Sequence, residues 1–245
     1  MRTLKRGLKG EDVRQLQAAL NKAITAGLVE DGIFGAKTQA AVKECQRANG
    51  WKVDGIAGRE TLGGLSLIDN KDFEIKTDDL KQFAAPHGSK TYGPNSSYST
   101  YASGGCGVTS FAIVHRAYGL APAGESGSDT ILRLGTYSYK NGYRPKNEGT
   151  NAGLFGTNGC RYQSITRSAS AIEDALRSGC LVILHLDKGY ANGYTGNGHY
   201  IVAYGIKNGY VLLRDVGSSK ESRQKVALSK CGAKLKHAYK MSKKV

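Results

Sequence analysis

One cysteine of this chain stands in a setting that suits nucleophilic chemistry. Cys106 follows a Ser-Gly-Gly run and precedes Gly107 and an apolar stretch at residues 108–118. The stretch predicts a buried helix, which places Cys106 at or just before the helix N-terminus. Unpaired backbone amides there stabilise a thiolate over a thiol and can receive a developing oxyanion. A lone cysteine at a helix start is more often structural, so a catalytic role requires a base nearby.

A histidine and an aspartate near the end of the chain supply the base and its partner. A glycine-rich segment, residues 193–198, leads into His199 at the start of an alternating, β-branched strand. A second strand, residues 210–215, follows an Asn208-Gly209 turn, which is a strong hairpin signal. The far end of the second strand returns beside the start of the first, so we expect His199 and Asp215 to be neighbours.

Together the three residues make a nucleophile, a base and an orienting carboxylate. His199 would take the proton of the Cys106 thiol and later protonate the leaving amine. Asp215 would fix the tautomer of the imidazole. Such a set predicts cleavage of an amide bond.

The order Cys, His, Asp, with the cysteine on a helix and the other two residues on a sheet, resembles the papain-like superfamily. More specifically, the chain is similar to the C39-like peptidase family, with matching segments at residues 103–110, 178–184, 198–202 and 210–215. The resemblance covers roughly residues 83–217. It implies an α+β domain at residues 72–245, in which a helix bearing Cys106 packs on an antiparallel sheet.

The family often places a glutamine upstream of the cysteine, where it donates to the oxyanion. Gln82 is the only glutamine between Gln46 and Gln163, so the resemblance implies it as the donor. Tyr98 and Tyr101 could serve instead, as a tyrosine hydroxyl does in some cell-wall peptidases. The plain alternative for Gln82 is an ordinary polar surface residue.

The N-terminal part of the chain contains an internal repeat. The pattern Asp-Gly-Ile-x-Gly-x-x-Thr begins at Asp31 and again at Asp54, an offset of 23 residues. Each copy predicts a tight turn that opens a helix, because glycine supplies unusual backbone angles and apolar residues then recur at helical spacing. An amphipathic helix at about residues 11–21 precedes both copies. These elements predict a small three-helix bundle.

Residues 4–65, with the run Gly-Leu-Lys-Gly-Glu-Asp-Val-Arg-Gln-Leu-Gln before the two turns, closely resemble the peptidoglycan-binding domain family of bacterial cell-wall hydrolases. The resemblance implies an anchor at residues 1–68. Its implied substrate-binding residues are Asp31, Phe34, Gly35, Asp54 and Gly55. Helix-start chemistry alone would also explain any single Asp or Gly among them. Phe34 either lines a sugar-binding groove or plugs the space between helices.

Length and hydropathy favour two domains and no membrane span. The 245 residues accommodate the bundle and a core of about 165 residues. No apolar run approaches the roughly 20 residues of a membrane helix, and the first residues show no signal-peptide pattern. We therefore expect synthesis in the cytoplasm and action on the cell wall after membrane breach, as for a phage lysis enzyme. The alternatives are a bacterial autolysin freed by lysis or one exported without a cleavable signal.

The charge predicts an anionic partner. The formal net charge is +15, and residues 220–245 hold nine Lys or Arg with Glu221 as the only acid. Nucleic acid is the first partner that such a segment suggests, but the chain shows no interleaved aromatic pattern and no nucleic-acid motif. An anionic cell wall satisfies the same electrostatics, and a solubilising end is the plainer alternative. We expect peptidoglycan as the partner, no nucleic acid, and a monomer.

The other cysteines and histidines form no metal-binding pattern. Five cysteines leave at least one thiol free, and no Cys-x-x-Cys is present. Cys45 and Cys180 have apolar neighbours and are expected in the core, whereas pairing of Cys160 with Cys231 is left open. His185 lies inside a predicted strand, where an interior histidine is the ordinary interpretation. No His-Glu-x-x-His is present, so we expect neither a metal nor another cofactor.

The combined interpretation is a peptidoglycan hydrolase of the endolysin type. Its cysteine peptidase domain would cleave an amide bond in the peptide stem or cross-bridge. The nearest alternative is an amidase that cuts the link between sugar and peptide, since a cysteine triad suits any amide. A wall-binding protein without activity is the alternative from another class.

Overall fold

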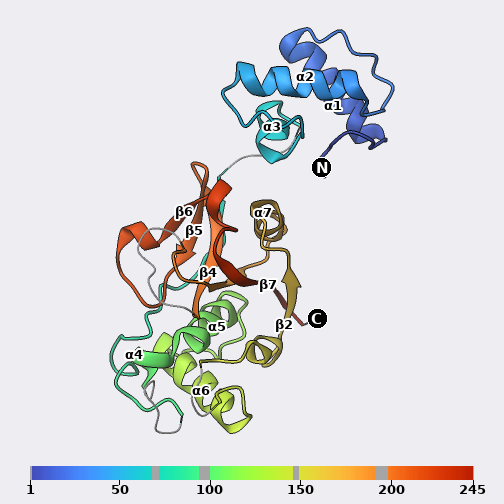
Figure 1. Ribbon diagram of the computed structural model, residues 1–245. Coiled ribbons are helices and arrows are strands. Elements are labelled where there is room, and N and C mark those ends of the chain that lie inside the picture. The colour runs from blue at the N-terminus through green and yellow to red at the C-terminus, as the bar shows by residue number, and fades with distance from the viewer. Residues whose placement is uncertain (1, 68–71, 94–99, 146–148, 191–197, 245) are drawn as a thin grey trace. The chain divides into compact units, whose positions relative to one another are not determined.

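The chain folds as two compact units, Met1–Lys71 and Asp72–Val245, here called unit 1 and unit 2 (Figure 1). The computed structural model describes residues 2–67, 72–93, 100–145, 149–190 and 198–244. The linker predicted between the two domains and most of the glycine-rich segment before His199 lie outside these ranges. No helix within them is long and apolar enough to cross a membrane.

Unit 1 contains the three predicted helices. They are α1 Glu11–Ile24, α2 Ala36–Ala48 and α3 Arg59–Gly64. Helix α1 runs one turn beyond its predicted end and stops at Thr25, which adopts a left-handed conformation with φ 52°. Apolar residues at helical spacing bury one shared core, as an amphipathic pattern requires. Its members include Leu4, Val13, Leu16, Leu20, Phe34, Val42, Cys45 and Leu62.

A buried glutamine from the preceding helix holds each repeat turn. The Gln17 side chain accepts the N–H of Gly32 at 2.9 Å and donates to Asp31 Oδ1 at 2.8 Å. The same Asp31 oxygen accepts the N–H of Ile33 at 2.8 Å. Gln46 makes the matching bonds in the second copy, to Asp54, Gly55, Ile56 and Thr61. The two aspartates therefore fix the backbone of their own turns.

Unit 2 is an α+β domain, which confirms the predicted fold class. Its helices are α4 Tyr101–Gly104, α5 Cys106–Ala117, α6 Gly127–Lys140 and α7 Ala169–Arg177, with short 3-10 turns η1 Ala152–Gly156, η2 Glu221–Arg223 and η3 Leu228–Lys230. Its strands are β1 Phe73–Glu74, β2 Cys160–Ile165, β3 Val182–Leu186, β4 His199–Lys207, β5 Tyr210–Arg214, β6 Lys225–Ala227 and β7 Leu235–Lys243.

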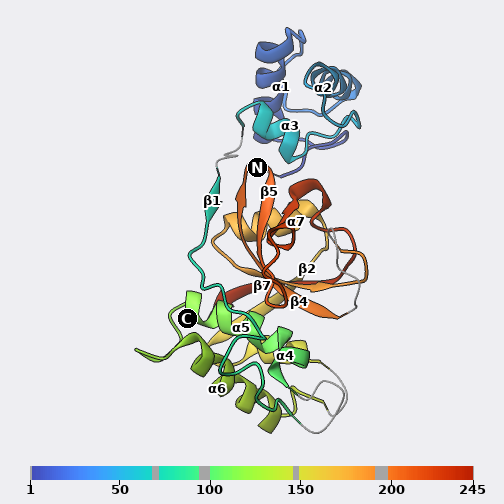
Figure 2. The same cartoon turned by 90° about the vertical axis from the view of Figure 1, so that its left-hand side faces the viewer.

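The described strands of unit 2 form one antiparallel sheet with a different core on each face. The order is β2-β7-β3-β4-β5-β6, and β1 pairs with β4. Because successive side chains point to opposite faces, Ile183 and Val202 join the core beside α5 and α6, whereas Leu184 and Ala203 join the core beside α7. Figure 2 shows the sheet between these helices, so unit 2 has three layers.

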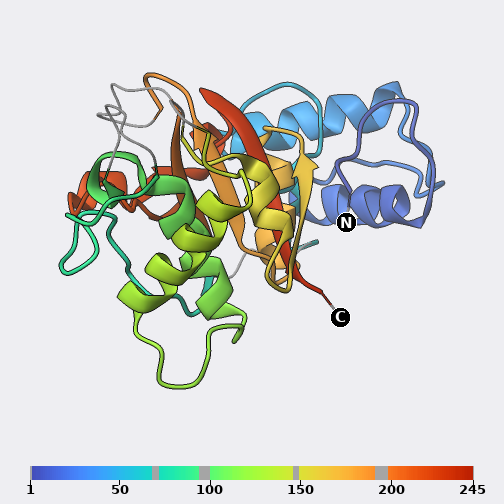
Figure 3. The ribbon, with the colours of Figure 1, turned by 90° about the horizontal axis from the view of Figure 1, so that it is seen from below.

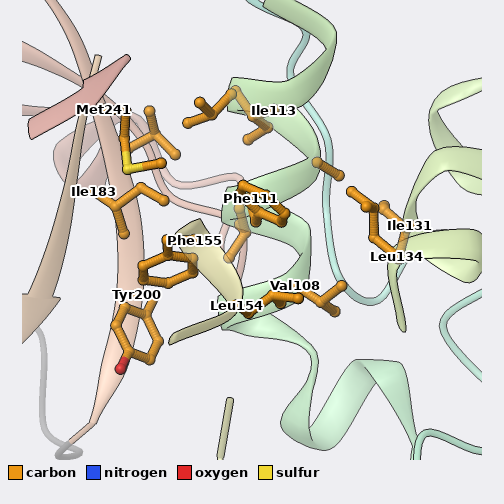
Figure 4. Packing of buried hydrophobic residues seen from close by; sticks show 14 of the residues in the cluster. Val108, Phe111, Ile113, Ile131, Leu134, Leu154, Phe155, Ile183, Tyr200 and Met241 are labelled. Atoms are coloured by element: carbon orange, nitrogen blue, oxygen red, sulfur yellow. The ribbon is translucent and has the colours of Figure 1, made fainter. Parts of the chain in front are cut away.

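Helix α5 runs through the larger of these cores. Its residues 107–115 are all buried. The Phe111 side chain lies between Ile131 of α6 and Phe155 of η1, whose ring centroid is 5.8 Å away (Figure 4). Figure 3 shows α4, α5 and α6 gathered on one side of the sheet. Packing on both sides fixes the axis of α5 and thereby the position of Cys106 at its first residue.

The glutamine network of unit 1 gives a stability prediction. Replacing Gln17 by Ala leaves the buried Gly32 N–H without its acceptor, which should lower the free energy of unfolding of unit 1 by about 2–3 kcal/mol. The same substitution at Gln15, which lies exposed on the same helix, should change it by less than about 0.5 kcal/mol. Urea titrations can follow the fluorescence of Trp51, the only tryptophan and part of the unit 1 core. Equal midpoints for the two variants would contradict the assignment.

Candidate active site

Cys106 is the first residue of α5, two residues before the predicted start of the helix, and is partly exposed. The glycines around it permit close packing. A side chain at Gly105 would come within 2.5 Å of the Tyr101 carbonyl oxygen, and one at Gly107 within 2.4 Å of the Thr150 side chain. The thiol therefore lies at the N-terminal end of a firmly packed helix, where backbone N–H groups favour a negative charge.

His199 is the first residue of β4 and pairs with Leu186 of β3. Its imidazole forms a hydrogen bond with the Cys106 thiol. The Cys106 Sγ also lies 3.9 Å from the carbonyl oxygen of Gly198, the residue before the histidine. The start of α5 and the start of β4 thus meet, although they are 93 residues apart in the sequence.

Asp215 directly follows β5 and is 0% exposed. Its Oδ1 lies 2.7 Å from Nε2 of His199 and accepts the N–H of Gly217 at 2.9 Å. An ionised carboxylate can only accept, so Nε2 of His199 carries a proton and Nδ1 is the nitrogen left for the thiol. The structure therefore brings Cys106, His199 and Asp215 together in the predicted order.

The hairpin that carries His199 and Asp215 turns at the predicted Asn-Gly pair. Asn208 has φ 50° and Gly209 has φ 75°. Two successive left-handed residues are the mark of a type I′ turn, whose twist matches that of the flanking strands. Lys207 and Tyr210 pair on either side of the turn.

A β-bulge in β4 decides which face of the hairpin Asp215 occupies. The register shifts by one residue at Tyr204. If the shifted register continues, Asp215 lies opposite Ile201. Ile201 and His199 are two residues apart, so Asp215 lies on the same face of the hairpin as His199. Without the extra residue Asp215 would fall opposite Val202 and point to the other face, because side chains alternate with a period of two.

The two ring contacts raise the pKa of His199. Burial alone would lower it, but the hydrogen bond to Asp215, the hydrogen bond to Cys106 and the negative charges of both outweigh burial and raise the pKa of His199 to about 9. The imidazolium therefore persists through neutral pH.

The pKa of the Cys106 thiol shifts in the opposite direction. Burial alone would raise the pKa of Cys106, but the hydrogen bond and charge of His199 and backbone hydrogen bonds from Tyr200 and Gly107 lower it below the ordinary value. Burial raises the pKa of Cys160 to about 11 and that of Cys231 to about 12. Of these three thiols, Cys106 alone has a pKa below the ordinary value, so it is the one that ionises most readily.

Three further side chains hold Asp215, and none was evident from the sequence. Lys81 Nζ donates to the Asp215 carbonyl oxygen at 2.9 Å. The Gln224 side chain accepts the Asp215 N–H at 3.2 Å and donates to the Ser218 carbonyl oxygen at 2.9 Å. Arg223 Nη1 lies 3.8 Å from Asp215 Oδ2. These residues belong to no motif, so only the folded chain reveals them.

Gln82 bonds both to the segment that follows Asp215 and to the segment that precedes Cys106. Its backbone N–H donates to the carbonyl oxygen of Val216, next to Asp215, at 2.9 Å. Its side-chain Nε2 donates to the carbonyl oxygen of Ala102, four residues before Cys106, at 2.6 Å. Only 8% of Gln82 is exposed, so the alternative of an ordinary surface residue is wrong.

Of the two tyrosines considered as oxyanion donors, only Tyr101 belongs to the described residues. Tyr101 is 3% exposed, and its hydroxyl donates to the carbonyl oxygen of Leu132 in α6 at 3.5 Å. That bond directs the hydroxyl toward α6. Tyr98 lies outside the described residues.

A row of stacked rings begins beside the catalytic candidates. Tyr200 follows His199 and stacks on His185, with ring centroids 4.3 Å apart, and His185 lies 5.6 Å from His237. Burial, together with the charges of neighbouring cationic groups, lowers the pKa of His185 to about 4. His185 is therefore a half-buried, neutral ring. Among the residues that the structure describes, no three His, Cys, Asp or Glu gather as a metal site.

The residues predicted to bind substrate in unit 1 lie either in the helical core or in the two repeat turns. Phe34 is 1% exposed and belongs to the core, so it plugs the space between helices. Asp31 is exposed, Gly35 and Asp54 are half-buried, and Gly55 is buried in its turn. Their contact with a wall ligand stays a prediction.

The five cysteines are all free thiols. Cys160 belongs to the core beside α5, whereas Cys231 belongs to the core beside α7. The sheet separates these two cores, so the pairing left open by the sequence does not form.

Comparisons with known proteins match both units. The model of the Peptidase C39-like family matches residues 80–245, and the model of a peptidoglycan binding domain matches residues 9–65. A solved structure of a C39-like peptidase from Bacillus anthracis is 13% identical and covers 71% of this chain and 99% of its own, with a TM-score of 0.43.

Two curated relatives share a shorter region. A zinc D-Ala-D-Ala carboxypeptidase of Streptomyces albus G is 43% identical over 79 residues, which are 31% of this chain and 28% of that protein. A spore cortex-lytic enzyme of Oceanobacillus iheyensis is 34% identical over 79 residues, 32% of this chain and 29% of that protein. The chain therefore spans less than a third of either relative.

The geometry predicts how the thiol reacts with pH. Iodoacetamide should modify Cys106 before the other cysteines, and its rate should rise with pH through a midpoint below about 8.5, the value of a free cysteine. Asp215→Asn should move that midpoint upward, because the imidazolium loses its charged partner and no longer stabilises the thiolate. Mass spectrometry of the alkylated peptides measures both effects.

Asp174→Asn supplies the matched control, since Asp174 lies exposed on α7. It should leave the midpoint unchanged. A midpoint for Asp215→Asn equal to that of the wild type would separate Asp215 from the charge state of the thiol.

Proposed function

The chain belongs to the Peptidase C39-like family, and from that premise we propose that unit 2 is a cysteine peptidase with Cys106 as its nucleophile. The observation that carries the proposal is the alignment of a partly exposed thiol, an imidazole and a buried carboxylate at the N-terminus of α5. His199 is the proposed base and acid, and Asp215 the residue that orients it.

The proposed reaction begins from a thiolate and an imidazolium. Cys106 Sγ attacks the amide carbonyl carbon, and the carbonyl oxygen gains the negative charge. Collapse of this adduct breaks the C–N bond, while His199 Nδ1 gives its proton to the departing amine. Water, deprotonated by the now neutral imidazole, then hydrolyses the thioester and releases the acid. Asp215 keeps the Nε2 proton in place during both halves.

The developing oxyanion needs donors beside Cys106. We assign the role to the backbone N–H of Cys106 and to the Gln82 side chain. A glutamine amide has two N–H donors, and the bond to the Ala102 carbonyl engages only one of them. A donor already fixed by other bonds needs no reorganisation in the transition state, which is why such groups are effective.

We propose that the substrate is an amide of peptidoglycan, in its peptide stem or cross-bridge. The match of residues 9–65 to a peptidoglycan binding domain supports this substrate. The two curated relatives bear names of wall enzymes, a D-Ala-D-Ala carboxypeptidase and a cortex-lytic enzyme. Residues 1–68 would then act as an anchor that raises the effective concentration of unit 2 at an insoluble target.

Action of the endolysin type, on the wall after membrane breach, belongs to the same proposal. In the anchor, Asp31, Gly35, Asp54 and Gly55 would act through the shape of the two repeat turns. Ile33 and Ile56, which follow the aspartates by two residues, are 42% and 37% exposed and give each turn an apolar contact.

A wall digest tests the activity and the bond together. Cys106→Ala should lower the clearing rate of a peptidoglycan suspension by about 10³-fold or more, because the nucleophile is lost. Cys180→Ala, which removes another partly exposed thiol, should clear at the wild-type rate. Endopeptidase action should release new peptide amino groups while stems remain on the sugar. Release of whole stems would identify an amidase, and full activity of Cys106→Ala would refute the proposed nucleophile.

Gln82 can be tested separately from the thiol. Gln82→Ala should lower kcat on a soluble wall peptide by about 10²–10³-fold, the usual loss when one oxyanion donor is removed. Gln163→Ala, on the exposed face of β2, should have no effect. The alkylation rate of Cys106 should be the same in both variants. A slowed alkylation with Gln82→Ala would instead point to a misplaced thiol.

A further inference from the structure

A cavity of unit 2 that includes none of the proposed catalytic residues is lined by charges of one sign. It has a volume of about 500 Å³ and lies where β5, β6 and η3 come together, and such a volume suits a small ligand or part of a chain. Tyr210, Lys225, Lys230 and Lys234 contribute to its wall. None of the nine described residues that line it is acidic.

The lysines of this cavity are only partly neutralised by the protein. Lys225 Nζ lies 3.1 Å from a Glu221 carboxylate oxygen, but the Glu221 side chain is 88% exposed. In the described part of the chain, neither Lys230 nor Lys234 forms an ion pair. Three ammonium groups around one cavity repel one another unless an anion enters.

The backbone also holds one of these lysines in an unusual conformation. Lys234 has φ 59°, a left-handed geometry that non-glycine residues adopt only at an energetic cost. Its carbonyl oxygen accepts the N–H of Asp187 at 2.8 Å, which fixes this conformation. The direction in which the Lys234 side chain leaves the backbone is thus set by the fold.

The lining favours one class of anion. Lysine offers a compact point charge that commonly binds the tetrahedral phosphate group, and three lysines in one lining suit a ligand that carries successive phosphates. Lys225 Nζ already lies over the Tyr210 ring, 5.9 Å from its centroid. The lining therefore offers at most one ring face for stacking, whereas single-stranded nucleic acids are bound by successive bases stacked on several aromatic side chains.

We propose that the Lys225–Lys230–Lys234 cavity binds the phosphate groups of a flexible polyol phosphodiester chain. Such a ligand brings successive negative charges without bases or carboxylates. The cavity would give unit 2 a binding site for an anionic surface polymer, separate from the site of amide cleavage. The proposal stands independently of the proposed peptidase activity, because the ligand contains no amide bond.

The test measures binding of end-labelled polyglycerol phosphate to the full chain by fluorescence anisotropy. The double variant Lys230→Gln with Lys234→Asn removes two charges, and asparagine tolerates the left-handed backbone at position 234. Its Kd at low salt should rise at least tenfold. The slope of log affinity against log salt should become less steep by about 1.4, since each phosphate contact with a single-stranded polyanion releases about 0.7 counterion.

The control is Lys240→Gln with Lys243→Gln, which lowers the net charge equally but lies on β7, away from the cavity lining. It should change the Kd less than twofold. Equal weakening in both double variants would overturn the proposal, because the effect would then come from net charge. A single-stranded DNA of equal phosphate number that binds as tightly and loses affinity with the same lysines would also overturn it.

Cleavage of a soluble wall peptide, measured in parallel, should be the same in the wild type and both double variants. Absence of cleavage by the wild-type chain, together with intact polymer binding, would count against the proposed function alone. Absence of polymer binding by the wild-type chain would overturn the cavity proposal alone.

Discussion

A carboxylate without solvent contact retains its charge only if the protein supplies partners, and Asp215 is such a group. Removing an ion from water costs several kcal/mol unless hydrogen bonds and an opposite charge replace the solvent. His199 at 2.7 Å and the Gly217 N–H at 2.9 Å supply both. The imidazole orientation and the acidity of the Cys106 thiol follow from this contact, because the protonated ring is the group that lowers the thiol pKa.

Local backbone chemistry explains how much of unit 2 could be predicted from the sequence. The Asn208-Gly209 turn and the helix behind Cys106 depend on a few neighbouring residues, so their sequence signals are short and sufficient. The bulge at Tyr204 is different, since an extra residue in a strand leaves no distinct pattern when both neighbours also fit a strand. Gln224 was likewise invisible, because its partner Asp215 is reached through a turn whose path no motif specifies.

The repeat in unit 1 shows the same limit. Its two turns were evident because they share a pattern, but the glutamines that hold them were not. Gln17 lies 14 residues before Asp31, whereas Gln46 lies 8 residues before Asp54. Gln17 lies seven residues before the end of α1, whereas Gln46 lies two residues before the end of α2, so equivalent contacts occur at unequal spacing. Equally, the burial of Phe34 depends on how three helices pack, which a single turn sequence does not reveal.

The first strand of unit 2 carries a mechanical consequence. Phe73 and Glu74 of β1 pair with β4, and the Ile75 N–H donates to the Tyr204 carbonyl oxygen at 2.8 Å. The approach is close, since a side chain at Gly205 would lie 2.5 Å from the Phe73 carbonyl oxygen. Tension that reaches residue 72 along the chain from unit 1 is therefore borne first by the β1–β4 ladder. β4, the strand that begins with His199, is therefore the strand to which this tension is transmitted.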